Sequence, residues 1–339
     1  MKNKRKHYAF KLFTLICVII VISIGWLLYH PFGSAVGSQY IIIEQGEGVH
    51  DIANDLRRKN IISSVQVFVL GAKVYGIYHK INAGVYVVDH PMSMAEIYRL
   101  ITSKNWQKNY FVIKDGMTYK TMQIGLESIT LIKHQLNFES AVLTKLQINS
   151  PNMEGWFYPD NYMLVPGQTD LSLLAQAHDM MVNQLDIVWK SRNKSTVYKN
   201  KYELLIMASL IQKEASQYSD MQKVSTVFNN RLRIKMSLQD DPAVFYGLGN
   251  PRDVYRSDFK KYTPYNTYMN KGLPPTPICM PSKMSLLAAA NPSDDKTLLY
   301  FVALPNGNIL YAKDYKTHKQ NASEYFRQKN KSKHTKKVN

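Results

Sequence analysis

The residue of this chain whose type and position most clearly suit chemistry is Glu214, which ends an apolar stretch within residues 202–216. Met207, Leu210 and Ile211 lie seven, four and three residues before it. In a helix these three residues lie on the same face as Glu214. Loss of water around a carboxyl on an apolar face raises its pKa and keeps it protonated near neutral pH. Glu214 is therefore a candidate proton donor, and the alternative is a carboxylate that pairs with a lysine at the edge of that face.

Four other segments suit the binding of a carbohydrate. Residues 154–160 (EGWFYPD) place three aromatics between two carboxylates, and residues 238–242 (LQDDP) form a polar turn. Aromatic faces fit the C–H surfaces of sugar rings, and carboxylates accept hydrogen bonds from sugar hydroxyls. Residues 263–268 (TPYNTY) and 272–278 (GLPPTPI) are stiffened by proline and predict loops. The stiff loops favour a binding groove, whereas aromatic clusters belong more often to the core than to a cleft.

The elements that must position these residues fall in one large region. The chain has 339 residues, of which 45% are hydrophobic and 12% aromatic. It can therefore bury a sizeable core, and it is too long for one average domain. Residues 110–326 hold every segment above, and their apolar periodicity predicts one helix that bears Glu214 and another over 221–236. We expect this region to be an α+β catalytic domain.

A smaller α+β module is expected over residues 38–105. Ser93 is well placed as the N-cap of its last helix, because a serine hydroxyl accepts from the free N–H groups of a first helical turn. The strand, Gly-rich turn and helix at its start resemble the LysM type of glycan-binding module, and a structural spacer is the alternative. The expected elements are a strand over 40–44, helices over 49–57 and 64–75, a strand over 84–88 and a helix over 93–101.

The amino terminus predicts a membrane anchor. Residues 1–11 carry five lysines or arginines and no acid, and residues 12–29 are uncharged and rich in Ile, Val and Leu. This run is long enough to span a bilayer. The positive flank holds the amino end in the cytoplasm, and Trp26 and Tyr29 suit the opposite interface, so the rest of the chain would lie outside. The alternative is a cleaved signal peptide, because small residues over 33–37 follow the run.

Charge and cysteine content exclude several functions. The net charge is +18, but five positive charges lie in residues 1–11 and others gather in 327–339, which we expect to be a basic disordered tail. An exported basic domain suits an anionic wall polymer or membrane surface, and no segment typical of nucleic-acid binding is present. Cys17 and Cys279 lie far apart and support neither a disulfide framework nor a metal site. We expect no cofactor, no metal and no nucleic-acid partner.

The motifs resemble, in type and order, those of the MltG/YceG-like family of endolytic murein transglycosylases over nearly the whole chain. Residues 154–160 are similar to the family's EG(W/F/L)-aromatic-PD(T)Y block, and residues 208–215 (ASLIQKEA) to its ASIxEKE(A/T) helix. The second glutamate of that helix motif is the catalytic one in the family, and it falls on Glu214. The first position, usually acidic too, is Gln212 here.

Further motifs extend the resemblance. Residues 228–246 are similar to the family's FxNRLxxxMxLQ(S/T)DPTVxY signature, with Asp240 in place of Ser/Thr and Ala243 in place of Thr. Residues 279–282 (CMPS) depart from the usual Asn/Thr-Pro-Gly ending. The other matches are YNTY at 265–268, GLPP at 272–275, ANP at 290–292 and YFV at 300–302.

The resemblance implies a lyase acting on peptidoglycan. Such enzymes cleave the β-1,4 bond between N-acetylmuramic acid and N-acetylglucosamine without water, because the muramyl 6-hydroxyl attacks its own anomeric carbon. One carboxyl of raised pKa can protonate the leaving oxygen and then accept the hydroxyl proton, a role we assign to Glu214. Candidates for holding the sugars or steadying the transition state are Gln239, Asp241, Asn266, Tyr268 and Glu154, the last of which could equally support the domain.

Two other functions stay open. A muramidase would use Asp241 or Glu154 to activate water, and a catalytically silent glycan-binding scaffold would need no acid at all. The resemblance further implies a single-pass protein of the inner (plasma) membrane that terminates the elongation of nascent strands with a catalytic domain outside the cytoplasm. Its expected partners are peptidoglycan glycan strands, the membrane and penicillin-binding synthases.

Overall fold

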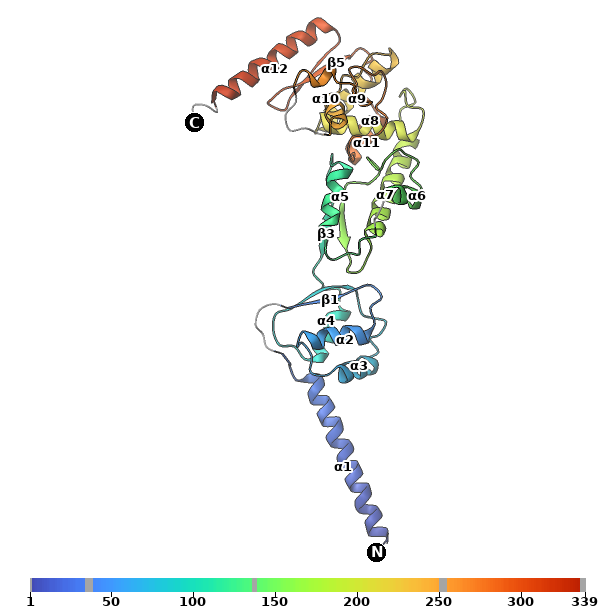
Figure 1. Cartoon of the computed structure of the whole chain (residues 1–339), viewed down its shortest axis with the longest axis vertical. Helices are drawn as coiled ribbons and strands as arrows, with labels where there is room; N and C mark the ends of the chain where they lie inside the picture. The colour runs from blue at the N-terminus through green and yellow to red at the C-terminus, as the bar shows by residue number, and fades with distance from the viewer. Residues whose placement is uncertain (1, 34–38, 136–138, 250–254, 336–339) are drawn as a thin grey trace. The chain divides into compact units, whose positions relative to one another are not determined.

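The computed structural model describes residues 2–33, 39–135, 139–249 and 255–335. Helices and strands are both present, which confirms the expected α+β class. The chain divides into two compact units (Figure 1). The first unit holds Met1–Phe111, Thr130–Lys133 and Met163–Thr169, and the second holds Val112–Ile129, His134–Tyr162 and Asp170–Asn339.

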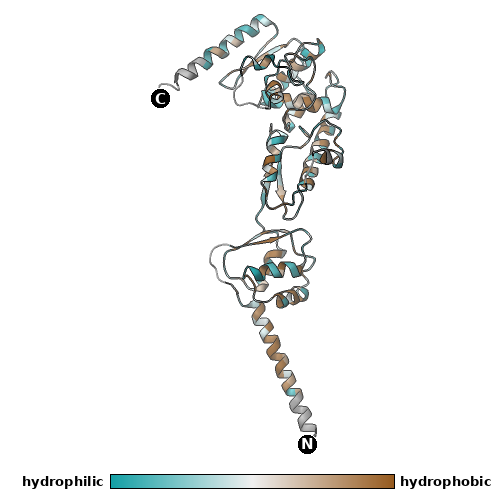
Figure 2. Ribbon diagram, in the orientation of Figure 1, coloured by the Kyte–Doolittle hydropathy of each residue, from teal (hydrophilic) through white to brown (hydrophobic). Residues whose placement is uncertain are grey.

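The first unit begins with the long helix α1 (Lys2–Tyr29). Its segment Phe10–Tyr29 is the one described part of the chain that is long and apolar enough to cross a membrane, with a mean hydropathy of 2.6 in its most apolar window. None of that window is buried against the rest of the protein, and Figure 2 shows it in brown. The small residues that favoured a signal peptide lie outside the described residues, except for Gly33.

The rest of the first unit surrounds an antiparallel two-stranded sheet, in which Ile41 of β1 lies opposite Tyr86 of β2. Every predicted element is present within one residue at each end, because the signals that define it are local. Ser93 caps α4 as expected, since its Oγ accepts from Glu96 N at 3.3 Å and its own N–H donates to Glu96 Oε2 at 2.8 Å. The elements are β1 (Gln39–Ile43), α2 (Val49–Arg58), α3 (Val65–Val74), β2 (Gly84–Val88) and α4 (Met94–Thr102).

Helix α8 (Lys201–Glu214) is the centre of the second unit, and α7, α9, α10 and α11 pack against it. All side chains from Leu204 to Ile211 are buried. The helix is therefore enclosed on every side along this stretch, whereas the periodicity indicated one apolar face. The surrounding helices are α7 (Asp170–Lys190), α9 (Tyr218–Arg233), α10 (Asp241–Gly247) and α11 (Lys283–Ala290).

The boundaries of α9 and α10 differ from the expected ones for identifiable reasons. We expected a helix over 221–236, but the chain leaves the helix after Arg233, and Lys235 takes a φ of +56° that no α-helix contains. The polar turn expected over 238–242 ends early, because Asp240 is the N-cap of α10. Residues 263–268 and 272–278 hold no helix or strand, as predicted for loops.

Two further strand pairs and four further helices complete the described elements. β3 (Asn109–Val112) and β4 (Asn161–Leu164) form one two-stranded sheet, and β5 (Tyr300–Ala303) and β6 (Ile309–Ala312) form an antiparallel hairpin. The other helices are α5 (Tyr119–Glu127), α6 (Glu139–Lys145), the short 3-10 helix η1 (Asp258–Lys260) and α12 (Tyr315–Thr335).

Helix α12 extends through residues that we expected to be disordered. The tail was expected to begin at Arg327, whereas the helix runs to Thr335. Lys, Arg and Gln are good helix formers, and the segment contains neither Gly nor Pro, so its charge does not prevent helix formation. Residues 336–339 lie outside the described residues.

Candidate active site

Glu214 stands where the buried helix α8 reaches the surface. Met207, Leu210 and Ile211 are fully buried, as the spacing predicted, and Glu214 is partly exposed. The next residue, Ala215, takes an extended conformation and ends the helix. Glu214 thus lies at the boundary between the apolar core and the surface.

Asp240 lies against this end of α8 and is fixed from three directions. Its side chain is fully buried, and its Oδ2 accepts a hydrogen bond from Ala243 N at 2.7 Å. Its backbone N–H donates to the hydroxyl of Thr267 at 2.8 Å, and that hydroxyl donates back to the Asp240 carbonyl at 3.1 Å. Gln239 before it has a φ of +51°, which is unusual for a residue other than glycine. The cap and the 263–268 loop therefore hold the Asp240 carboxyl in one place.

Three carboxyls gather at this point, of which the sequence predicted Glu214 and Asp241 as site residues but not Asp240. Glu214 and Asp240 hydrogen-bond through their side chains, and the charge of Asp241 acts on both. The helix motif itself supplies no second acid, because Gln212 stands two positions before Glu214. The acidic neighbours come from the start of α10 instead. The one sequence signal for Asp240 was its departure from the Ser/Thr of the family signature.

The pKa values of these groups are all raised. Burial raises the pKa of Glu214 well above its usual range, and the charge of Asp240, the hydrogen bond to it and the charge of Asp241 add to this effect. Burial also raises the pKa of Asp240 to about 7, although the Ala243 N–H and the bond to Glu214 oppose the rise. The pKa of Asp241 is raised by burial, against a hydrogen bond from Tyr268. A proton is thus retained in this cluster near neutral pH.

Two further candidates connect to the cluster through the 263–268 loop. The Tyr268 hydroxyl donates to Asp241 Oδ1 at 2.5 Å. Asn266 is fully buried, and its Nδ2 donates to the carbonyls of Phe259 and Lys261 at 3.0 and 2.7 Å, while its Oδ1 accepts from Tyr268 N at 3.0 Å. Its amide is therefore engaged within the protein and steadies Tyr268, a placement that favours a positioning role over direct contact with a sugar.

Glu154 and Gln212 connect secondary-structure elements. Glu154 is almost fully buried, and it accepts from Tyr119 N at 2.9 Å and from the Tyr246 hydroxyl at 3.1 Å. It thereby joins the start of α5 to α10, which favours the supporting role that we left open. Gln212 Oε1 accepts from Ser282 N at 3.0 Å, at the start of α11.

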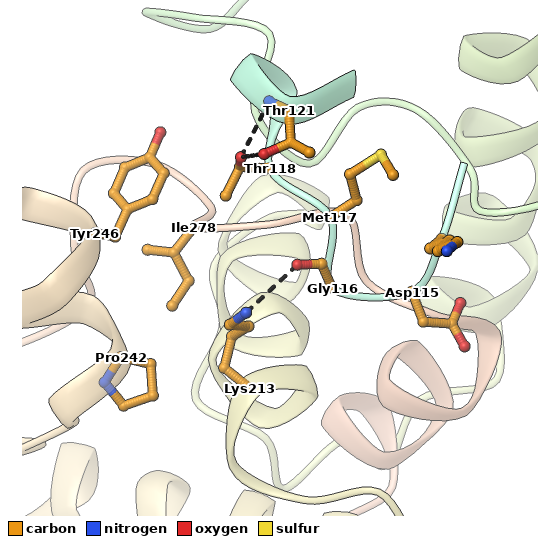
Figure 3. Close-up of a pocket in the computed structure, with 10 residues that line it drawn as sticks. Asp115, Gly116, Met117, Thr118, Thr121, Lys213, Pro242, Tyr246 and Ile278 are labelled. Atoms are coloured by element: carbon orange, nitrogen blue, oxygen red, sulfur yellow. Dashed lines mark hydrogen bonds between the residues drawn. The ribbon is translucent and has the colours of Figure 1, made fainter. Parts of the chain in front are cut away.

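A cavity of about 490 Å³ is lined by chain neighbours of the carboxyl cluster, although none of the three acids lines it (Figure 3). Lys213 and Pro242, the chain neighbours of Glu214 and Asp241, both line it. Figure 3 shows the Lys213 ammonium directed at the carbonyl of Gly116, to which it donates at 3.4 Å. The other lining residues are Lys114, Asp115, Met117, Thr118, Thr121, Tyr246 and Ile278.

A second cavity, of about 670 Å³, shares Thr118, Thr121 and Tyr246 with the first. Its other walls carry two tyrosines, Tyr119 and Tyr265, beside Glu154. The two cavities together offer aromatic surfaces and hydroxyls, the groups that a polymeric sugar requires. Among the residues that the structure describes, no group of three or more His, Cys, Asp or Glu side chains is placed to hold a metal ion.

Comparisons with known proteins agree with the motifs. A sequence model of the YceG-like family matches residues 41–324. An endolytic murein transglycosylase of Bacillus subtilis is 32% identical over 315 residues, which cover 86% of this chain and 85% of the relative. A Streptococcus pneumoniae protein of the same name is 23% identical over 85% of this chain, which spans only 58% of that relative's length. The crystal structure of a yceG-like protein from Listeria monocytogenes, at 23% identity, covers 84% of this chain and 99% of its own with a TM-score of 0.52, and shows a shared fold.

Proposed function

The chain belongs to the YceG-like family, and we propose that it is an endolytic murein transglycosylase, a lyase that cuts within peptidoglycan glycan strands. The bond cleaved is the β-1,4 bond between N-acetylmuramic acid and N-acetylglucosamine, and the product ends in 1,6-anhydro-N-acetylmuramic acid. The observation that carries the proposal is the carboxyl of Glu214, which ends a buried helix and has a pKa well above the usual range, while its chain neighbour Lys213 lines a cavity.

Glu214 would act first as acid and then as base. Its carboxyl protonates the glycosidic oxygen as the bond to the muramyl C1 breaks, and the N-acetylglucosamine leaves with a free 4-hydroxyl. The muramyl 6-hydroxyl then attacks C1, and the Glu214 carboxylate accepts its proton. The enzyme ends with the proton it started with, and no water is consumed. A raised pKa suits both steps, because the group must be protonated before cleavage and basic after it.

The other candidates take supporting roles in this proposal. Asp241, held by Tyr268, would place negative charge near the developing oxocarbenium ion. Gln239 would bind sugar amides or hydroxyls. Asn266 and Glu154 would keep the loop and α10 in place, since their side chains are engaged within the protein.

A muramidase is the second candidate, because acidic side chains do lie near Glu214. A hydrolase needs a second carboxylate that can activate water or attack the sugar. Asp240 is fully buried, Asp241 accepts the Tyr268 hydroxyl, and Glu154 accepts two hydrogen bonds. These placements favour the one-carboxylate reaction.

The first unit suggests how the enzyme reaches its substrate. We propose that α1 anchors the chain as a single span in the inner (plasma) membrane, with its basic end in the cytoplasm and the second unit outside. The strand, glycine turn and helix that carried the LysM resemblance are present as β1, Gly46 to Gly48 and α2, and we propose that this module binds glycan. Penicillin-binding synthases would be partners in terminating nascent strands.

Product analysis tests the function. The full chain in detergent, incubated with uncrosslinked glycan strands, should release fragments that end in 1,6-anhydro-N-acetylmuramic acid, and Glu214→Gln should abolish this release while the protein stays folded. Glu203→Gln makes the same change at the other end of α8 and should retain activity. Reducing muramic ends would establish the muramidase, and no cleavage of uncrosslinked or natural strands by the unchanged protein would favour a scaffold.

A further inference from the structure

The Asp240 carboxyl is incompletely satisfied when both acids of the pair are ionised. Its Oδ2 accepts from Ala243 N, but no N–H or hydroxyl group of the described residues donates to its buried Oδ1. A buried carboxylate oxygen without a donor is costly. Within the described part of the chain, no lysine, arginine or histidine forms an ion pair with Glu214, Asp240 or Asp241. A proton carried by a neighbouring acid is the donor that this oxygen lacks.

The surroundings identify Glu214 as that neighbour. Asp240 and Asp241 face it from α10, and Tyr268 faces it from the 263–268 loop with its hydroxyl proton given to Asp241. Lys213, next to it on α8, directs its ammonium at the Gly116 carbonyl. Two carboxylates in contact cannot both be ionised without strong repulsion, so the pair retains one proton.

We propose that Asp240 is a positioning residue that shares one proton with Glu214 and thereby orients the catalytic carboxyl. In the free enzyme the proton is bound to Glu214, which donates a hydrogen bond to Asp240 Oδ1. The Ala243 N–H holds Asp240 in place through Oδ2. When Glu214 gives this proton to the glycosidic oxygen, two negative charges remain side by side. Their repulsion makes Glu214 a stronger base for the 6-hydroxyl proton, and its return restores the starting pair. The role of this pair in catalysis rests on the proposed function, whereas the sharing of one proton between Glu214 and Asp240 does not.

Two substitutions at position 240 isolate this role, because each new residue can still cap α10. Asp240→Ser removes the carboxyl, and Asp240→Asn keeps its shape while offering an amide donor that stabilises the ionised Glu214. Asp314→Ser and Asp314→Asn are the matched controls, since Asp314 accepts from Thr317 N at 2.9 Å before α12 and is exposed.

The first measurement is the pH profile of kcat/KM for anhydro-product release by the full chain in detergent. Loss of the Asp240 carboxyl should move the alkaline limb of the profile to lower pH by about one unit or more, because Glu214 then loses its proton more easily. Both Asp240 variants should show the shift and both Asp314 variants should not. Alkaline limbs that superimpose on that of the unchanged enzyme, in variants whose circular dichroism spectra show that they are folded, would overturn the proposal.

The second measurement does not depend on activity. Infrared difference spectra of the full chain near pH 7 should contain the C=O stretch of a protonated carboxyl, and this band should be lost in Asp240→Ser and in Glu214→Gln. If the band behaves so while the unchanged protein releases no anhydro product, the pair stands and the proposed function falls. If the product forms but no such band exists, the function stands and the shared proton is refuted.

Discussion

The Tyr268 hydroxyl donates a hydrogen bond of 2.5 Å to Asp241 Oδ1, and this contact joins the 263–268 loop to the first residue of α10. It is the bond that opposes the effect of burial on the pKa of Asp241. The negative charge that we assign to Asp241 near the reacting sugar therefore depends on a residue of another segment. The same loop fixes Asp240 through Thr267, so one loop controls two of the three acids.

Tyr268→Phe should lower kcat about tenfold, the equivalent of one charge-assisted hydrogen bond. Without the hydroxyl the pKa of Asp241 rises further, so the acid limb of the pH profile of kcat/KM should move to higher pH. Tyr262→Phe is the control, since Tyr262 is exposed at 72% on the neighbouring loop. An unchanged acid limb in Tyr268→Phe would separate Asp241 from the reaction.

The raised pKa values predict that the site destabilises the fold at neutral pH. The pKa of Asp240 is about 7 and that of Glu214 is well above 4.5, so between about pH 4 and pH 7 the native state binds more protons than the unfolded chain. The free energy of unfolding must then fall as the pH rises through this window.

Asp240→Asn should therefore be more stable than the unchanged protein at pH 7.5, by about 1 kcal/mol or roughly 2 °C in Tm, and equal to it near pH 4. Thermal unfolding followed by circular dichroism measures both. Asp314→Asn should not stabilise, because hydrogen bonds from Thr317 lower the pKa of Asp314 and its linkage has the opposite sign. A variant at position 240 that unfolds earlier at pH 7.5 would show that the carboxyl is a net stabilising group.

Gln212 should be replaceable by the acid that the family pattern has at this position. Its Oε1 accepts from Ser282 N at 3.0 Å, and a glutamate oxygen can accept the same bond. Gln212→Glu should thus retain kcat within about threefold, whereas Gln212→Ala should destabilise the protein by about 1–3 kcal/mol because the Ser282 N–H loses its acceptor. Urea unfolding together with the rate of product release distinguishes this structural role from a catalytic one.

The apolar helix at the amino terminus should keep the protein in membranes during an alkaline wash. Phe10–Tyr29 is long and apolar enough to span a bilayer, and such a span is not extracted by high pH. A variant that lacks residues 1–29 should appear in the soluble fraction. If the protein expressed from the complete gene is released by the wash and its mass is lower than that of the full chain, a cleaved signal peptide is established instead.

The small module could be predicted closely because its signals lie within a few residues of what they specify. Ser93 and Glu96 cap one helix between themselves, and the alternating residues of 84–88 define one strand. The spacing of Met207 from Glu214 likewise predicted that Met207 is buried.

The carboxyl cluster could not be predicted in the same way, because it depends on long-range packing. Asp240 reaches Glu214 only because α10 packs on the end of α8, and Thr267, far along the chain, holds the cap. Nor could periodicity show that α8 is enclosed on all sides, since Ser209 reads as polar although its hydroxyl is satisfied by the Ile206 carbonyl and Ile278 N–H.

Gly155 should tolerate no side chain, and the reason is contact more than backbone strain. Its φ is +83°, and a Cβ built on it lies 2.5 Å from Pro277 Cβ, on the 272–278 loop. Gly272 has a similar φ of +91° but nothing within 4 Å of such a Cβ. Gly272→Ala should therefore cost only the backbone penalty of about 1 kcal/mol, while Gly155→Ala should cost about 1–3 kcal/mol more because the proline must move. Equal unfolding free energies for the two variants would mean that the 272–278 loop moves at little cost. This loop could not then form a rigid side of a sugar-binding groove.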